Sequence, residues 1–196
     1  MMLSAAMEDY LKAIYYLQRE GGEDRVATSA IAGALEVTPP TVTSMVGKLE
    51  ERDLIAREKY RGVRLTDRGE TVALEVIRHH RLLEAYLAEH LDYDWSEVHD
   101  EADALEHHIS EELERRIAAA LDDPEVDPHG DPIPTADLDP LDDSNGTTLA
   151  EYGEGDLVVI ERVDDRKPDE LRYLAEHGIR PGTRVEVVEV TPFGMV

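Results

Sequence analysis

The sequence has 196 residues, enough for one or two domains, and its 45 Asp and Glu residues against 20 Lys and Arg residues give a formal net charge of −25. The absence of cysteine excludes a disulfide framework, a thiolate metal site and a cysteine nucleophile. No apolar run approaches the ~18 residues of a membrane-spanning helix, and the start of the chain lacks the features of a signal peptide, so we expect an intracellular protein.

The first part of the chain is predicted to form three helices. Apolar residues recur at helical spacing between about residues 5 and 20, where two glycines end the pattern. A second, short helix starts at Thr28 or Ser29, and Thr38 followed by two prolines offers the N-cap and first turn of a third. Because the second and third helices are short and joined by a tight turn, we interpret them as a helix-turn-helix.

Residues 54–66 follow as two strand-like arms with a turn at Arg61-Gly62, which predicts a β-hairpin and hence a winged helix-turn-helix. Residues 37–68 hold seven basic and five acidic residues, a net positive charge in an otherwise acidic chain, and this favours DNA binding. A helical hairpin used for protein contacts is the alternative. The candidate base-contacting residues are Thr38, Pro40, Thr41, Thr43, Ser44 and Lys48, and the candidate phosphate-contacting residues on the wing are Arg57, Lys59, Arg61 and Arg64.

The middle of the chain is predicted to form acidic helices, one from Asp67 to about His90 and another over roughly residues 95–121. His80 and Glu84 are four residues apart and therefore share a helix face. At about 100° per residue, one sector of the following helix carries His99, Asp103, Glu106 and His107.

Two such faces turned toward each other predict a metal site, because clustered carboxylates and imidazoles repel one another unless a cation lies among them. Oxygen and nitrogen donors suit Mn²⁺ or Fe²⁺, with Zn²⁺, Co²⁺ and Ni²⁺ as competitors. The alternative is that these are solvated faces of acidic helices. His79 and His108 lie off both faces and are predicted at the surface.

The helical pattern ends near residue 122. Residues 126–154 are rich in Pro, Gly and Asp and hold no Lys or Arg, which predicts a solvated linker with an ordered turn at 129–134. Strand-like runs at 156–160 and 184–190 flank a short helix at 171–176 and indicate a small β-rich domain. A further strand is predicted to begin near Pro192, so this domain is expected to stop before it is complete.

Several motifs, in this order along the chain, resemble the diphtheria-toxin-repressor family of metal-dependent transcriptional regulators: Met7–Lys12, Thr38–Val42, Arg57–Val63, Leu65–Gly69, His80–Glu84, Val98–His108 and Pro128–Pro134. The resemblance implies a mainly α fold with small β parts. Its expected domains are a winged helix-turn-helix at 1–70, a helical metal-binding and dimerisation domain at 71–125, the linker at 126–154 and an SH3-like ferrous-transport-type domain at 155–196. The evenly acidic composition further predicts a halophilic archaeal source.

The resemblance divides the candidate ligands between two sites. Asp9, Asp103, Glu106 and His107 fall on the primary, regulatory site, whereas His80, Glu84 and His99 fall on the ancillary site, to which the C-terminal domain would add Glu170. The iron-responsive branch has Met and Cys where this chain has Asp9 and Asp103, and the manganese-responsive branch has acids at both positions. That second branch also has Glu in place of Lys12 and is expected to lack the C-terminal domain. The ligands of the primary site therefore resemble those of the manganese-responsive branch, whereas the domain content of the chain resembles the iron-responsive branch.

The implied function is a repressor that binds double-stranded operator DNA as a homodimer when Mn²⁺ or Fe²⁺ occupies the primary site, with no organic cofactor and no membrane partner. It would control genes of metal uptake and homeostasis. A metal-sensing adaptor that acts through protein contacts is one alternative. A metal-dependent hydrolase is another, but the chain lacks paired Glu-x-x-His motifs, a nucleophile and a phosphate loop, so no enzyme activity is expected.

Overall fold

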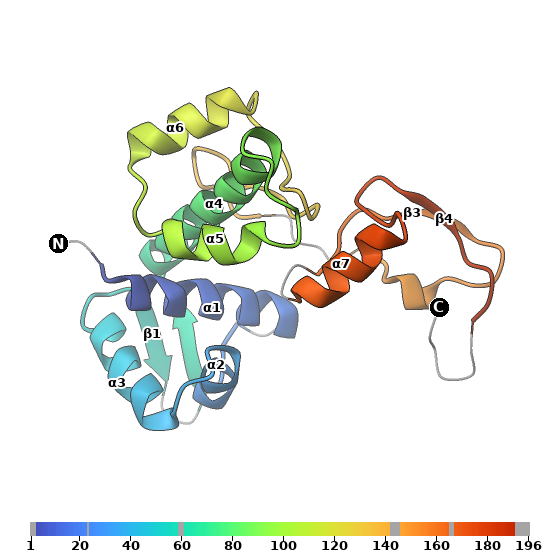
Figure 1. Ribbon diagram of the computed structural model, residues 1–196. Helices are drawn as coiled ribbons and strands as arrows, with labels where there is room; N and C mark the ends of the chain where they lie inside the picture. The colour runs from blue at the N-terminus through green and yellow to red at the C-terminus, as the bar shows by residue number, and fades with distance from the viewer. Residues whose placement is uncertain (1–2, 23, 59–60, 142–145, 165–166, 191–196) are drawn as a thin grey trace. The chain divides into compact units, whose positions relative to one another are not determined.

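The computed structural model (Figure 1) describes residues 3–22, 24–58, 61–141, 146–164 and 167–190. The chain divides into two compact units. The first unit comprises residues 1–79 and 134–140, and the second comprises residues 80–133 and 141–196. Helix α4 (Asp67–His90) begins in the first unit and ends in the second.

The first unit contains the predicted helix-turn-helix. It consists of α1 (Ala5–Gly21), α2 (Thr28–Ala34) and α3 (Pro39–Glu50), close to the expected bounds. The apolar stripes of these helices meet in a core, where the side chains of Leu11, Ile14, Ile31, Val42, Val46 and Leu49 are fully buried. Thr38 occupies the N-cap position of α3, but its hydroxyl pairs with the Thr41 hydroxyl at 2.8 Å instead of capping the backbone.

The wing is an antiparallel hairpin of β1 (Ile55–Glu58) and β2 (Gly62–Leu65), which pairs Ile55 with Leu65. Alternate residues of β2 face the core, so Val63 and Leu65 are buried. Val26, just before α2, exchanges two backbone hydrogen bonds of 2.8 and 2.9 Å with Val63. The wing is therefore tied directly to the helix-turn-helix.

Replacing Gly62 with alanine is expected to destabilise this unit. Gly62 has a φ of +97°, and a Cβ there would lie 2.2 Å from the Val26 carbonyl oxygen. The backbone strain alone costs about 1–3 kcal/mol. Urea denaturation should therefore show a lower free energy of unfolding for Gly62→Ala. The control Gly47→Ala lies within α3, where a Cβ meets no atom within 4 Å, and should stabilise the protein by up to about 1 kcal/mol. Equal effects of the two substitutions would contradict this account of the wing.

The helical part of the second unit contains the end of α4, α5 (Val98–Leu105) and α6 (Glu111–Ala120), packed around a shared apolar core that includes Leu82, Ala102, Ile117 and Ile133. The single helix predicted over residues 95–121 is wrong, because the chain breaks between α5 and α6. Ser110 begins α6, and its hydroxyl accepts the Leu113 N–H at 3.3 Å. Three glutamates in the first turn favour the helix dipole at the same point.

The segment after α6 differs from a solvated linker. Val126 and Pro132 form an isolated antiparallel bridge, which closes the expected turn. Asp127, His129 and Ile133 are buried, so this stretch contributes to the interior of the second unit.

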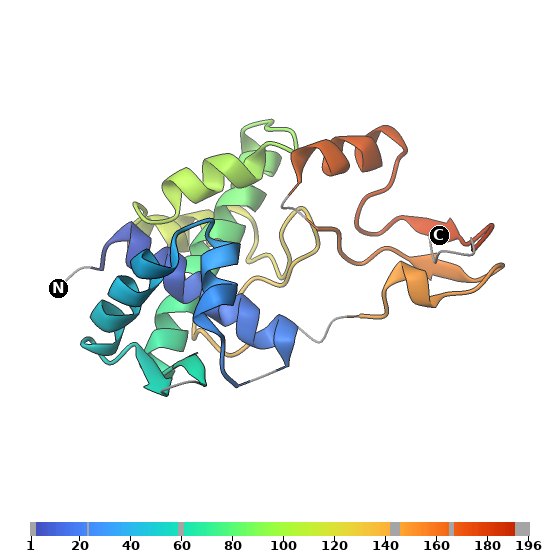
Figure 2. The ribbon, with the colours of Figure 1, turned by 90° about the horizontal axis from the view of Figure 1, so that it is seen from below.

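The C-terminal module contains the short 3₁₀ helix η1 (Leu149–Glu151), β3 (Leu157–Val159), α7 (Pro168–Glu176) and β4 (Arg184–Glu186). β3 and β4 pair antiparallel, and α7 lies to one side of this ribbon (Figure 2). Both strands are shorter than predicted, and the strand expected from Pro192 lies outside the described residues. Within the described part of the chain, none of the helices combines the length and apolar character that a transmembrane span needs.

Candidate functional site

His80, on α4, lies between two carboxylates. Its Nδ1 is 2.6 Å from Glu106 Oε2, and its Nε2 is 3.0 Å from Glu84 Oε1. All three side chains are at most 4% exposed. The ring can donate to both carboxylates only when both nitrogens carry a proton, and the resulting cation offsets part of the buried negative charge.

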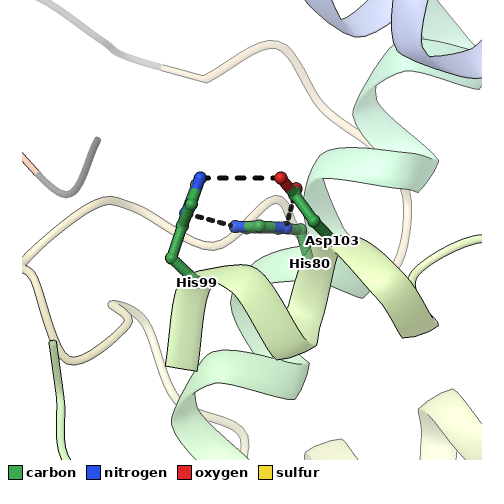
Figure 3. Close-up of side chains that lie close together, drawn as sticks. All are labelled: His80, His99 and Asp103. Carbon is green, nitrogen blue, oxygen red and sulfur yellow. Dashed lines mark hydrogen bonds and ion pairs between the residues drawn. The ribbon is translucent and has the colours of Figure 1, made fainter. Parts of the chain in front are cut away.

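Helix α5 adds His99 and Asp103 to this group (Figure 3). His99 Nδ1 lies 3.2 Å from His80 Nε2 and 3.1 Å from Glu84 Oε1. Asp103 Oδ1 lies 3.2 Å from His80 Nδ1, and its side chain is 51% exposed. His80, His99 and Asp103 each offer one donor atom within 4.8 Å of the others, so they are able to share a divalent ion. The i, i+4 pairs read from the sequence are thus confirmed as neighbours in space.

Within the second unit, one predicted primary-site donor lies beside two predicted ancillary donors. Asp103, expected in the primary site, lies with His80 and His99, while His107 lies beside Glu106 with 3.4 Å between Nε2 and Oε1. Glu106 is the C-cap of α5, so the helix break turns it toward His80. Asp9 is half-buried on α1 in the first unit, and Glu170 is exposed on α7, where it pairs with Lys167 at 2.7 Å.

His79 and His108 are both predicted at the surface, because they fall off the metal-donor faces of their helices. His108 is exposed, as predicted. His79 is only 8% exposed, so its predicted surface position is wrong. The reason is that α4 is enclosed on most sides along this stretch, and Arg78, His80 and Arg81 are buried as well.

A further donor group joins the predicted ligand Glu84 to Asp127 and His129, which were not predicted as ligands. Each offers one ligand atom within 4.8 Å of the others, and all three residues are buried. Within the described part of the chain, Glu84 Oε2, Asp127 Oδ2 and His129 Nδ1 have no hydrogen-bond partner. Glu84 Oε2 and His129 Nδ1 lie 3.8 Å apart, too far for a hydrogen bond. Buried polar atoms are normally hydrogen-bonded, so three converging atoms without a hydrogen bond fit a bound cation.

The loop that carries Asp127 and His129 is held by its own hydrogen bonds. Asp127 Oδ1 accepts the backbone N–H groups of His129 at 2.8 Å and of Asp131 at 3.0 Å. Arg81 donates to the Pro132 carbonyl and places its Nε 3.8 Å from Asp127 Oδ2. The one signal in the sequence was an Asp-x-His spacing inside a turn, which has no periodicity to mark it as buried.

The charges in this group balance one another. Burial opposes the ionisation of Glu84, but His80, His129 and His99 outweigh it and hold the pKa of Glu84 well below its usual range. Burial, together with the charges of Glu84 and Asp131, raises the pKa of Asp127 to about 7. These surroundings therefore favour the ionised form of Glu84 and the protonated form of Asp127.

The surroundings of His129 also favour its protonated form. Burial alone would lower its pKa, but the close approach and charge of Glu84, the charge of Asp127 and the hydrogen bond to the Trp95 carbonyl raise that pKa to about 9. Because a metal ligand must be unprotonated, a cation that binds here must displace the proton.

The candidate DNA-binding face lies on α3 and the wing. The six candidate residues on α3 are exposed: Thr38, Pro40, Thr41, Thr43, Ser44 and Lys48. On the wing, Arg57 and Arg61 are exposed and Arg64 is half-buried, whereas Lys59 lies outside the described residues. Glu58 pairs with Arg25 at 3.0 Å and with Arg61 at 3.3 Å, so part of the positive charge of the wing is already neutralised.

A winged helix-turn-helix followed by a helical domain rich in metal donors defines a metal-responsive DNA-binding regulator. Comparison with protein-family models supports the same class of protein. The iron dependent repressor N-terminal DNA binding domain matches residues 2–63, the iron dependent repressor metal binding and dimerisation domain matches residues 66–135, and the FeoA domain matches residues 147–196. The chain belongs to this iron-dependent, or diphtheria-toxin, repressor family. It is a metal-dependent transcriptional repressor and not an enzyme.

Known relatives match nearly the whole chain. The iron-dependent repressor IdeR of Mycobacterium tuberculosis is 36% identical over 200 residues, which cover 96% of this chain and 86% of that protein. The diphtheria toxin repressor of Corynebacterium diphtheriae is 34% identical over 191 residues, which cover 93% of this chain and 84% of that protein.

The solved structures correct one expectation about the manganese branch. A manganese-dependent transcriptional repressor in complex with manganese matches with a TM-score of 0.84 and 40% identity, over 95% of this chain and 85% of its own. ScaR with bound Cd²⁺ matches with a TM-score of 0.79 and 35% identity, over 95% of this chain and 86% of its own. Coverage of this extent includes the C-terminal module, so the expectation that manganese-responsive relatives lack it is wrong.

Proposed function

We propose that this repressor binds operator DNA as a dimer when Mn²⁺ or Fe²⁺ occupies a primary site of Asp9, Asp103, Glu106 and His107. The observation that carries the proposal is the buried Glu106 carboxylate, which lies beside His107 and within 2.6 Å of the His80 ring. Oxygen and nitrogen donors without sulfur favour hard divalent ions, and Zn²⁺, Co²⁺ or Ni²⁺ would compete in vitro. The genes under its control would serve metal uptake and homeostasis.

The ion acts by connecting two bodies. Asp9 belongs to α1 of the first unit, whereas the other three ligands belong to the second. Without an ion, repulsion between carboxylates disfavours their approach. With an ion, the two DNA-binding units of a dimer are set at the spacing of successive major grooves on a pseudo-palindromic operator. Metal and DNA must then strengthen each other's binding equally, typically by about 1–3 kcal/mol.

We propose a second ion in the ancillary region of His80, Glu84 and His99, with Asp127 and His129 as further ligands. The support is the set of buried donor atoms on Glu84, Asp127 and His129 described above. Glu170 would join them only after breaking its ion pair with Lys167. The assignment of Glu170 as a ligand therefore requires side chains on α7 to rotate.

Operator binding in molar KCl tests the proposed function, since the acidic composition leads us to propose a salt-rich cytoplasm. Fluorescence anisotropy of a labelled operator is measured anaerobically against Mn²⁺ and Fe²⁺. We expect Arg57→Ala and Arg64→Ala to weaken binding on all sequences and to reduce the slope of log K against log salt by about 1 per phosphate contact. Metal binding, measured by calorimetry, should not change.

The matched control is Arg115→Ala on α6, where Arg115 pairs with the exposed Glu112. This substitution removes the same charge away from the proposed DNA face and should leave operator affinity unchanged. Wild-type affinity in both wing variants would contradict the assignment of the contacts. Operator binding that ignores metal altogether would favour a metal-sensing adaptor or an unregulated DNA-binding protein instead.

A further inference from the structure

Trp95, in the loop between α4 and α5, makes two contacts with His129. Its backbone carbonyl accepts a hydrogen bond from His129 Nε2 at 2.7 Å. Its ring stacks on the imidazole with 5.6 Å between ring centroids and 27° between planes. Because a carbonyl can only accept, Nε2 carries the proton, and Nδ1 is the atom left to face Glu84 and Asp127. Trp95 therefore sets both the tautomer and the plane of the His129 ring.

The C-terminal module reaches the same tryptophan. The guanidinium carbon of Arg180, beyond α7, lies 4.7 Å from the centroid of the Trp95 ring, which is a cation–π contact. The loop is shaped by Asp94, whose Oδ1 accepts the Ser96 N–H at 2.9 Å and the Ser96 hydroxyl at 2.7 Å. Those hydrogen bonds lower the pKa of Asp94, and the charges of Arg180 and Arg172 lower it further. Both a ring and a carboxylate thus attract Arg180 to this loop.

A second contact joins the module to the loop of His129 itself. The Val163 N–H donates to the His129 carbonyl at 3.0 Å, and Arg162 pairs with Asp131 at 3.1 Å. At Gly130 a Cβ would lie 2.0 Å from the Glu161 carbonyl oxygen, so the two backbones approach as closely as glycine allows. The module therefore holds His129 from two directions, through its backbone and through Trp95.

We infer that Trp95 and Arg180 are positioning residues for the His129 ligand, so that docking of the C-terminal module tunes the affinity of the donor group formed by Glu84, Asp127 and His129 for its ion. This inference rests on the second ion proposed above. Neither residue would touch that ion. Arg180 acts on Trp95, and Trp95 acts on the ring that presents Nδ1. By linkage, an ion bound at this group must in turn favour the docked module.

The sole tryptophan of the chain makes the test direct, because all tryptophan emission comes from Trp95. The full chain, freed of metal by chelation, is titrated with Zn²⁺, a closed-shell ion that does not quench by paramagnetism. Emission is followed beside equilibrium dialysis, which counts bound ions. We expect Arg180→Gln to bind as many ions as the wild type, but to bind the second ion about 10-fold or more weakly. The metal-induced change in emission should also be smaller. Arg180→Lys keeps a cation over the ring and should recover most of the affinity.

The matched control is Arg184→Gln on β4, which removes the charge of an exposed arginine that has no role in the contacts of Trp95 and Asp94 described above. It should behave as wild type. Wild-type affinity and emission change in Arg180→Gln would overturn the inference. His129→Gln separates this failure from that of the proposed second ion. If His129→Gln loses one ion and Arg180→Gln behaves as wild type, only the positioning role is contradicted. If His129→Gln keeps the wild-type ion count and affinity, both the positioning role and the proposed second ion are contradicted.

Discussion

Replacement of Glu106 by glutamine is expected to abolish metal-dependent operator binding, with a loss of at least about 100-fold in DNA affinity at saturating Mn²⁺. Glutamine keeps the volume of this buried side chain but removes the negative charge that faces His80 and His107. Loss of an outer-shell partner alone costs a metal site about 10–100-fold, and we propose Glu106 as a direct ligand. Anisotropy of a labelled operator, titrated with Mn²⁺, measures the loss.

The control for this prediction is Glu112→Gln, a neutralised glutamate on α6 whose partners are the exposed Arg115 and Arg116. It changes the net charge by the same amount and should bind the operator as wild type does. Circular dichroism melts would confirm that both variants are folded. A Glu106→Gln protein that still responds fully to Mn²⁺ would remove Glu106 from the regulatory site.

The metal-free protein is expected to lose thermal stability as the pH rises from about 6.5 to 9. The pKa of His129 is raised to about 9 in the folded chain, above its ordinary value of about 6.5, because Glu84 and Asp127 favour the charged ring against the effect of burial. The folded state therefore binds this proton more tightly. Its stabilising effect is complete below the unfolded pKa and is lost as the pH rises through 9.

Asp127 acts in the same direction at lower pH. Burial raises its pKa to about 7, so its contribution to stability falls between about pH 4 and 7. Glu84 acts in the opposite sense, because its lowered pKa gives a contribution that is lost on acidification. The metal-free melting temperature should accordingly be highest between these limits, on the acidic side of neutrality.

Bound Mn²⁺ should raise the melting temperature by more at pH 8.5 than at pH 6.5, because fewer protons must then be displaced. A free ion concentration 100-fold above Kd stabilises a folded protein by about 2.7 kcal/mol. Differential scanning calorimetry measures both trends at constant salt. His129→Gln should flatten the metal-free profile, whereas the exposed control His177→Gln should not. A metal-free melting temperature that stays constant or rises between pH 6.5 and 9 would rule out the proton held by His129.

Helical periodicity was sufficient to predict the DNA-binding unit. The apolar residues of α3 fall on one stripe, and Val42, Val46 and Leu49 are all fully buried. The break between α5 and α6 escaped prediction because the apolar pattern continues through it. Ile109 packs against the same core as Ala102 and Ile117 on either side. The local capping signal at Ser110 was the better guide, since the chain changes direction there without changing which residues face the core.

The metal-donor residues were also only partly predictable from the sequence. His80 with Glu84, and His99 with Asp103, follow from i, i+4 spacing because a helix makes such pairs neighbours regardless of what surrounds them. Asp127 and His129 lie on an irregular loop, where neither direction nor burial follows a period. Their position depends on Trp95, Arg81 and the 161–163 segment, which are distant in sequence. Long-range packing of this kind is not encoded in any local pattern.

The two backbone hydrogen bonds between Val26 and Val63 bear on how such a regulator acquires new target genes. The hairpin is hydrogen-bonded to the segment that leads into α2, so α3 and the wing, which we propose contact DNA, belong to one packed unit. Under our proposal that Thr41 and Ser44 contact bases, exchange of these exposed side chains would change the preferred bases without disturbing that unit. The distance between two half-sites does not depend on these side chains. A change in that distance would instead require a change in the way two copies of the chain are joined.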